Sequence, residues 1–216
     1  MDEDKPGAKP TIVPRPNGPL LVKGLGQMRN SRGEALEVRE TLALCRCGQS
    51  ANKPFCDSTH RKIGFSDANT AADGSADKVD RYEGPELTIL DNRYLCAHAG
   101  TCTDGLAEVF RYGTEPWIDP AGSKADRIQE AVRACPSGAL AFALGGSETR
   151  DFDRDPAITI ARNGPYYVVG GIDLETDAWG QGASREHYAL CRCGQSKRKP
   201  FCDGSHWEVE FTDEKN

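Results

Sequence analysis

Two segments of this chain concentrate side chains that bind soft metal ions. Residues 191–206 read CRCGQSKRKPFCDGSH and residues 45–60 read CRCGQSANKPFCDSTH, so each segment holds three cysteines and one histidine. Thiolate sulfur and imidazole nitrogen are the ligands that zinc and iron sites use. The segments therefore predict two metal sites of similar chemistry. The expected ligands are Cys45, Cys47, Cys56 and His60 in the first and Cys191, Cys193, Cys202 and His206 in the second.

The spacing of these ligands predicts how they are paired. Cys191 and Cys193 are two residues apart, and such residues project to the same side of an extended segment. Cys202 and His206 are four residues apart and share one face of a helical turn. Each motif can thus present two pairs of ligands. The short segment between them carries Asp203, an expected helix N-cap, and Gly204, which lets backbone N–H groups approach the site.

Ligand types alone leave a structural zinc site and an iron site equally open. The full spacing, C-x-C-x₂-S-x₃-P-x-C-D-G-S-H, resembles the signature of the CDGSH iron–sulfur family, the mitoNEET-like proteins. The resemblance implies a [2Fe–2S] cluster in each motif, its inner iron on the first two cysteines and its outer iron on the third cysteine and the histidine. The first motif departs at Ser58, where the signature has glycine. The residues expected beside the ligands are Asp57, Ser58, Asp203 and Gly204.

A third set of cysteines lies between the two motifs. The segment Cys96-Ala-His-Ala-Gly-Thr-Cys102 and the later Cys135-Pro136 resemble the bacterial ferredoxin pattern C-x₂-C-x₂-C…C-P, with Ala99 in place of the middle cysteine. The resemblance implies a [3Fe–4S] cluster, or a [4Fe–4S] cluster with His98 as a candidate non-cysteine ligand. The alternative is a unit that has lost its cluster and serves as a scaffold.

The elements that must position these ligands form an internal repeat. The two CDGSH units are expected at residues 11–65 and 157–212, and residues 157–211 align with 11–65 without a gap at an offset of 146, which places Asn163-Gly164-Pro165 on Asn17-Gly18-Pro19. An apolar stretch on each side of Asn17-Gly18 predicts a β-hairpin, and residues 41–44 predict a strand leading into the first motif. A repeated unit of this kind predicts two units that pack on each other. Tyr166 and Tyr167 are expected to pack between strands, and His187 to lie at the surface.

The middle unit, residues 81–145, predicts strands at 86–90 and 139–144. Ser123 to Asp126 resembles a capping box that opens a helix, and Ile128, Ala131, Val132 and Cys135 recur at helical spacing, so Cys135 is expected to close that helix. Residues 1–10 are expected to be a disordered tail, and residues 66–80 and 146–156 linkers. The expected fold is α+β: two β-rich CDGSH units of the NEET type forming an intramolecular pseudo-dimer, plus a ferredoxin-like βαββαβ domain.

Composition limits the remaining choices. The net charge of −6 argues against nucleic acid as a partner, and no apolar run reaches the length of a membrane span. The amino terminus has no signal-peptide shape, so we expect a reducing cytoplasm in which structural disulfides are rare. Nine cysteines then fit three sites of three cysteines better than disulfides.

The function expected is electron transfer by a non-catalytic iron–sulfur protein, although the sequence leaves an enzymatic role undecided. We expect a monomer with internal pseudo-two-fold symmetry whose partner is a redox protein or an apo iron–sulfur acceptor. One alternative is that the chain stores or transfers iron–sulfur clusters, or uses them to sense redox state or pH, because a ligating histidine can be protonated and lost. The other alternative is a structural metal-binding module for interactions.

Overall fold

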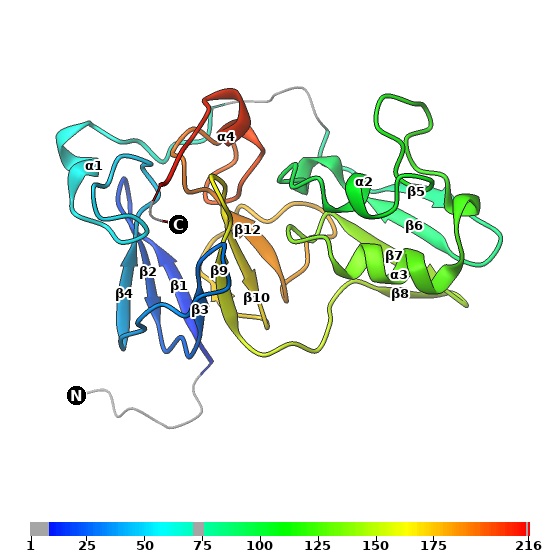
Figure 1. Ribbon diagram of the computed structural model, residues 1–216, viewed down its shortest axis with the longest axis horizontal. Coiled ribbons are helices and arrows are strands. Elements are labelled where there is room, and N and C mark those ends of the chain that lie inside the picture. Colours follow the sequence, from blue (N-terminus) through cyan, green and yellow to red (C-terminus); the bar gives the residue numbers. More distant parts are fainter. Residues whose placement is uncertain (1–8, 71–75, 215) are drawn as a thin grey trace.

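The computed structural model describes residues 9–70, 76–214 and 216, and within them it is a mixed α+β structure. In these described ranges, twelve strands form three four-stranded sheets, and the helices are few and short (Figure 1). Residues 1–8 of the expected tail and residues 71–75 of the expected linker lie outside the described residues. No helix in the described part is long and apolar enough to cross a membrane.

Both repeats begin with the expected β-hairpin. In the first, β1 (Thr11–Pro14) pairs antiparallel with β2 (Leu20–Lys23), and β2 pairs with β4 (Thr41–Leu44). In the second, β9 (Ala157–Ile160), β10 (Tyr166–Val169) and β12 (Tyr188–Leu190) pair in the same way. Asn17 and Asn163 both have φ 48° at the hairpin turns, a left-handed conformation that asparagine tolerates better than most residues.

The two repeats exchange short strands. β3 (Met28–Arg29) leaves the first repeat and pairs parallel with β9, and β11 (Asp173–Leu174) leaves the second repeat and pairs parallel with β1. The sheets therefore have the orders β11-β1-β2-β4 and β12-β10-β9-β3. Each sheet contains strands from both repeats, so neither repeat completes its sheet alone.

One hydrophobic core joins the two repeats. Alternate residues of β1 and β2 (Ile12, Leu20 and Val22) are fully buried together with Ile158 and Tyr166 of the second repeat. This alternation is the two-residue period of a strand with one face on a core. The shared core fixes the two CDGSH motifs, which follow β4 and β12, relative to each other.

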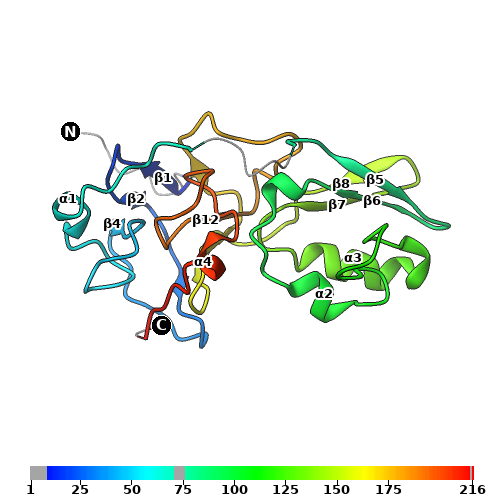
Figure 2. The same cartoon turned by 90° about the horizontal axis from the view of Figure 1, so that it is seen from above.

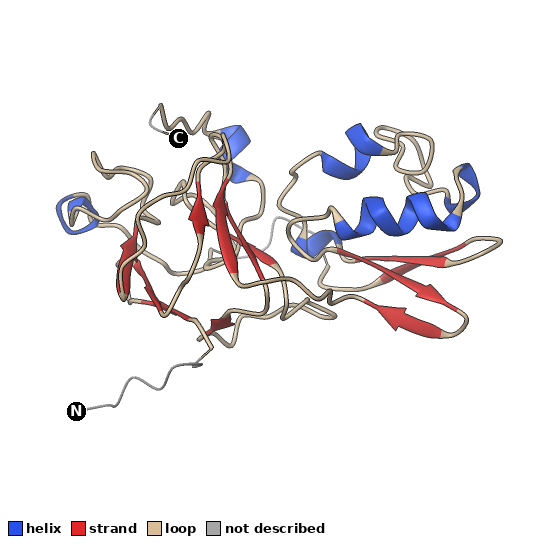
Figure 3. Cartoon of the chain, turned by 60° about the horizontal axis from the view of Figure 1, so that its bottom comes forward, coloured by secondary structure: helices blue, strands red, loops and turns tan. Residues whose placement is uncertain are grey.

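The middle unit is a separate sheet with its helices on one face (Figures 2 and 3). β5 (Asp80–Glu83), β6 (Thr88–Asp91), β7 (Leu140–Leu144) and β8 (Ser147–Thr149) follow one another as antiparallel neighbours. Between β6 and β7 come two 3₁₀ turns and two helices. These are η1 (Arg93–Leu95), α2 (Thr101–Gly105), η2 (Pro120–Gly122) and α3 (Ala125–Arg133).

This arrangement differs from the expected βαββαβ order at its centre and at its edges. Where a hairpin was expected between α2 and α3, only Phe110 and Ile118 form an antiparallel bridge. The segment between them contains Pro116, which has no N–H to donate to a ladder. Two further strands, β5 and β8, widen the sheet, and β8 falls in the segment 146–156 that was expected to be a linker. Gly145 and Gly146 have φ 57° and 86°, as a two-residue hairpin turn requires.

Helix α3 forms where its pattern predicts, although its ends differ in detail. Ile128 and Val132 are buried against the sheet. Lys124 occupies the N-cap position without a side-chain hydrogen bond, so Ser123 does not form the expected capping box. The helix ends at Arg133, and Cys135 follows it instead of closing it.

Each cysteine motif ends in a one-turn helix, α1 (Thr59–Lys62) or α4 (Ser205–Glu208), which carries the histidine of the motif. Figures 1 and 2 both place the middle unit beside the second repeat, near α4, and on the far side of that repeat from α1. The two CDGSH motifs therefore have different surroundings.

Candidate metal centres

The first motif folds back onto the strand that precedes it. The N–H of Cys45 donates to Pro54 O at 2.8 Å, and the N–H of Cys56 donates to Ala43 O at 2.8 Å. These bonds bring the end of the loop beside its beginning. Cys45 and Cys47 place their sulfur atoms 3.6 Å apart, and Cys56 Sγ lies 3.4 Å from His60 Nδ1. The structure thus forms both expected ligand pairs of the first motif.

Asp57 stabilises the turn that carries the outer pair. Its carboxylate accepts hydrogen bonds from the Thr59 N–H at 3.0 Å and the Ala51 N–H at 2.8 Å. Hydrogen bonds from Thr59 and then Ala51 hold the pKa of Asp57 well below its usual range. Ser58 occupies a left-handed conformation with φ 70°, and its N–H points at Cys56 Sγ at 3.4 Å.

The second motif repeats this geometry in a more buried setting. Cys191 and Cys193 have their sulfur atoms 3.8 Å apart, and Cys202 Sγ lies 3.5 Å from His206 Nδ1. Asp203 accepts hydrogen bonds from the Ser205 N–H and the Lys197 N–H. Burial acts to raise the pKa of Asp203, but the hydrogen bond from the Ser205 hydroxyl at 2.7 Å and the two N–H bonds outweigh it and lower the pKa. Gly204, and not the expected Asp203, is the N-cap residue of α4, with φ 90°.

The donor atoms can be compared with those that metal groups require. Two sulfur ligands of one tetrahedral metal lie about 3.8 Å apart when each metal–sulfur bond is about 2.3 Å, which matches each pair. Among the described residues, no three His, Cys, Asp or Glu side chains lie close enough to share one ion. A mononuclear zinc site needs all four ligands together, whereas a binuclear group needs two separate pairs. The donor set therefore fits a binuclear group.

The inner pairs of the two motifs lie on loops that touch. Gly48 and Gly194 follow the second cysteine of each motif and have φ 78° and 85°. A Cβ added at Gly194 would lie 2.6 Å from Cys47 O, and one added at Gly48 would meet Cys193 O in the same way. Any larger residue at either glycine would push the loops apart. The close approach of the two candidate centres therefore depends on these glycines.

The three middle cysteines share one buried region. Cys135 belongs to the core of the middle unit, and Cys96 and Cys102 pack against that core. Burial, followed by the charge of Cys135, raises the pKa of Cys96 to about 12 and that of Cys102 to about 11. The His98 N–H points at Cys96 Sγ at 3.4 Å. The structure thus brings Cys135 into one core with Cys96 and Cys102, which lie far from it in the chain.

The loop that carries Cys96 and His98 packs directly on the second CDGSH motif. A Cβ added at Gly204 would lie 2.7 Å from His98 Cδ2. Trp207 Nε1 donates to His98 O at 3.0 Å, and Ala97 shares a small buried cluster with Cys202. The expected cluster-binding loop of the middle unit and the outer ligand loop of the second motif thus form one junction.

Two further contacts support this junction from either side. The Arg198 guanidinium donates to Tyr94 O and lies 4.3 Å from the centre of the Tyr94 ring. Tyr167 of β10 packs in the cluster of Ala97, Ala189 and Cys202. The tyrosine thus packs at the junction with the middle unit, and not only between strands as expected.

Tyr166 is a residue whose role the repeat did not predict. Its hydroxyl lies 2.7 Å from Cys45 O and 3.0 Å from Pro54 O, so a residue of the second repeat supports the first motif. Leu20 stands at the equivalent position of the first repeat and cannot form such a bond. A buried tyrosine usually finds a hydrogen-bond partner, and that rule was the signal available in the sequence.

His187 is fully buried, which corrects the expectation of a surface residue. Its Nδ1 lies 2.9 Å from Ser184 Oγ and 2.9 Å from Glu186 Oε2. Arg154 pairs with the same glutamate, and Ser184 donates to Asp151. This polar network joins the segment after β8 to the second repeat, so the histidine belongs to an internal interface.

Comparisons with known proteins assign the three units. The profile of the family described as "Iron-binding zinc finger CDGSH type" matches residues 17–61 and 163–207. The profile described as "Divergent 4Fe-4S mono-cluster" matches residues 82–145. Two curated relatives, each named "Uncharacterized protein YjdI", from Escherichia coli strain K12 and Escherichia coli O157:H7, are 31% identical over 61 residues. The match covers 28% of this chain and 80% of each relative.

Proposed function

This chain belongs to the CDGSH iron–sulfur family, with a divergent 4Fe-4S mono-cluster domain between its two CDGSH units, and from this we propose that it is an electron carrier. Each CDGSH motif holds one [2Fe–2S] cluster, and the middle unit holds a [3Fe–4S] or [4Fe–4S] cluster. These clusters supply one-electron chemistry when bound. The chain's own residues position them and control their exposure to water.

In the proposed assignment, each CDGSH cluster is held by the two ligand pairs of its motif. Cys45 and Cys47 bind the inner iron of the first cluster, and the separation of their sulfur atoms, 3.6 Å, supports this. Cys56 and His60 bind its outer iron, and the second motif repeats the scheme. Cys96, Cys102 and Cys135 bind the middle cluster, with His98 as a candidate fourth ligand.

One observation carries the choice of electron transfer: the three candidate centres are joined in series by contacts between their ligand loops. The loop of Cys96 packs on Gly204 of the second motif, and the inner loop of the second motif packs on that of the first. A relay needs its sites close together, whereas storage of clusters does not. The series runs from the middle unit, through the second motif, to the first.

The burial of the expected ligands also favours electron transfer over cluster donation. Cys202 and His206 are 3% and 5% exposed, and Ala97 of the middle unit packs with Cys202, so the second site is almost fully buried. A cluster donor must open its outer ligands to an acceptor, which this arrangement opposes. The first site is less covered, because Cys56 is only partly buried. Cluster donation from the first site is therefore the second candidate function.

The test uses the intact chain as isolated. Iron and acid-labile sulfide are counted, and the protein is cycled repeatedly between dithionite and air while its electron paramagnetic resonance (EPR) spectrum is recorded. We expect about eight irons with a four-iron middle cluster, or about seven with a three-iron one, from two irons in each CDGSH motif. The clusters should remain intact over many cycles, and neighbouring clusters in the reduced protein should show magnetic interaction.

Two results would contradict the proposal. A colourless protein with zinc in place of iron would indicate that the chain is a structural metal-binding module. Passage of iron and sulfide to an apo-ferredoxin on each cycle, with loss of colour from the chain, would make cluster donation the function.

A further inference from the structure

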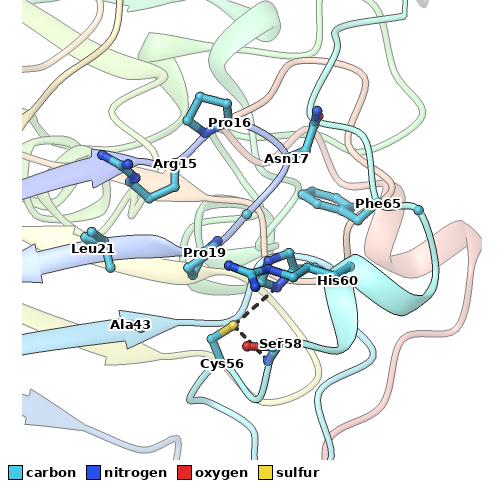
Figure 4. Close-up of a pocket in the computed structure, with 13 residues that line it drawn as sticks. Arg15, Pro16, Asn17, Pro19, Leu21, Ala43, Cys56, Ser58, His60 and Phe65 are labelled. Atoms are coloured by element: carbon cyan, nitrogen blue, oxygen red, sulfur yellow. Dashed lines mark hydrogen bonds between the residues drawn. The ribbon is translucent and has the colours of Figure 1, made fainter.

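The outer face of the first CDGSH site is an open cavity of about 810 Å³. Figure 4 shows Cys56 and His60 at its base, with Arg15, Leu21 and Ser58 around it. The cavity adjoins the outer ligand pair, the part of a bound cluster that would lie nearest to solvent. Any electron that leaves the series at its first-site end would leave through this face.

The same face of the second site is covered. The offset of 146 places Leu21 on Tyr167, Ala43 on Ala189 and Cys56 on Cys202. In the second repeat these three equivalents pack with Ala97 of the middle unit. Two copies of one surface thus occur in one chain, and one copy shows what such a surface can bind: a small iron–sulfur module.

The two copies differ in charge. Arg61 stands where the second repeat has Trp207, whose indole donates to the middle unit, and Arg15 stands where it has Ala161. Both arginines are exposed, and neither forms an ion pair with any of the described residues. None of the described residues that line the cavity is acidic. An apolar contact surface in the second repeat is therefore a basic surface in the first.

Arg61 lies in the same cavity as the outer ligand pair. Arg15, Arg61, Cys56 and His60 all line it, so both positive side chains border the expected ligands. A negatively charged surface that approached Arg15 and Arg61 would come directly over the outer ligand pair.

Ser58 places a side chain where the second motif leaves room for the middle unit. A Cβ at Gly204 would meet the His98 ring, and Ser58 carries such a Cβ at the equivalent position, in the same left-handed conformation. A loop like that of His98 cannot dock on the first site in the same way. The face is thus left for a different occupant.

We propose that the cavity around Arg15, Arg61 and the Cys56–His60 pair is the docking surface for a small acidic ferredoxin-type protein, which exchanges electrons with the chain at this end of the series. The electron exchange in this proposal rests on the proposed electron-carrier function, whereas the binding of the ferredoxin does not. Oppositely charged patches steer such partners together and make their association sensitive to salt.

The test compares two variants with the same change in net charge. Arg15→Glu/Arg61→Glu reverses the proposed surface. Lys23→Glu/Arg162→Glu is the matched control, because both residues are exposed and neither lines the cavity. The probe is an acidic [2Fe–2S] ferredoxin, and its affinity is measured by calorimetry at low and high salt with both proteins oxidised. Iron and sulfide content confirm that each variant retains its clusters.

We expect the wild-type chain to bind the ferredoxin at low salt and the docking variant to bind it about tenfold or more weakly, as for steered pairs. The control should change by less than about threefold. Equal weakening in both variants, absence of binding, or binding that salt does not affect would overturn the proposal. If the chain forms a dimer and the Arg15→Glu/Arg61→Glu variant abolishes that dimer, the occupant is a second copy of the chain. That result would also overturn the proposal.

Stopped-flow electron exchange then separates the two proposals. If the docking variant alone loses salt-dependent binding but the wild-type chain exchanges no electrons, the docking surface is supported and the electron-carrier function is contradicted. If the docking variant still exchanges electrons as fast as the wild-type chain, the electron-carrier function is supported and the proposed docking surface is contradicted.

Discussion

Gly204 lies against the ring of His98, so that a Cβ at this position would come within 2.7 Å of His98 Cδ2. The equivalent residue of the first motif, Ser58, has the side chain that Gly204 lacks. The missing Cβ at this turn is thus one of the differences that let the second motif, and not the first, accept the middle unit. Because Gly204 is not an expected ligand, this contact can be changed without removing a ligand.

The variant Gly204→Ser should displace the His98 loop while both motifs keep their clusters. Overpacking of this kind costs about 1–3 kcal/mol of stability. We expect loss of the magnetic interaction between the middle cluster and the second CDGSH cluster, measured by EPR of the reduced chain. The reverse change, Ser58→Gly, is the matched control and should leave that interaction intact. An unaltered spectrum in Gly204→Ser, at full cluster content, would show that this contact does not couple the two centres.

Tyr166 gives a prediction that crosses the two repeats. Removing its hydroxyl in Tyr166→Phe leaves Cys45 O and Pro54 O without that buried donor, which costs about 1–3 kcal/mol. We expect faster loss of the first cluster, although the substitution is in the second repeat. Tyr188→Phe is the control, because its hydroxyl donates to Ile172 O, away from the first motif. The loss of each cluster is followed by EPR. Equal rates of first-cluster loss in the two variants would refute this role of Tyr166.

The sequence predicts the local parts of this structure. Cys45 and Cys47 come together because they are two apart on an extended segment, and Asn17-Gly18 predicts the hairpin because it suits a tight turn. The contacts between units are not local. The exchanged strand β3 is only two residues long, Tyr166 has a leucine as its repeat equivalent, and His187 is buried by a partner segment after β8. Such contacts depend on how the units pack, and no short pattern encodes that.

Each repeat contains one arginine–aspartate pair at the same offset, and the two pairs differ in burial. The side chains of Arg192 and Asp213 are 0% and 2% exposed, whereas those of Arg46 and Asp67 are 2% and 28% exposed. Removing one partner of a buried pair costs about 3–5 kcal/mol, and solvent lowers that cost. We therefore expect Asp213→Asn to lower the free energy of unfolding by about 3 kcal/mol and Asp67→Asn by about 1 kcal/mol. Denaturant titrations measure both, and equal losses would contradict this difference.

Asp91 predicts a pH dependence of stability in the middle unit. Burial raises its pKa to about 7, Asp80 on the neighbouring strand adds to this, and Arg93 and Trp117 oppose it. Its Oδ2 has no hydrogen-bond partner among the described residues. The folded chain therefore holds a proton that the unfolded chain releases near its ordinary value of 3.8. Stability is then fully present below about pH 4, declines as pH rises, and levels off above about pH 7.

The variant Asp91→Asn should remove this decline because an amide does not ionise. At pH 8 it should be more stable than the wild-type chain by an amount on the order of 3 kcal/mol, since one pKa unit corresponds to about 1.4 kcal/mol. Glu86→Gln is the control, because it removes an equal charge from an exposed position of the same unit. Thermal unfolding of the cluster-containing chains between pH 5 and pH 8 gives the difference between variant and wild type at each pH, in which acid effects common to both chains cancel. That difference should grow with pH for Asp91→Asn and stay constant for Glu86→Gln. A constant difference in both would show that the Asp91 carboxyl is already ionised in the folded chain throughout this range.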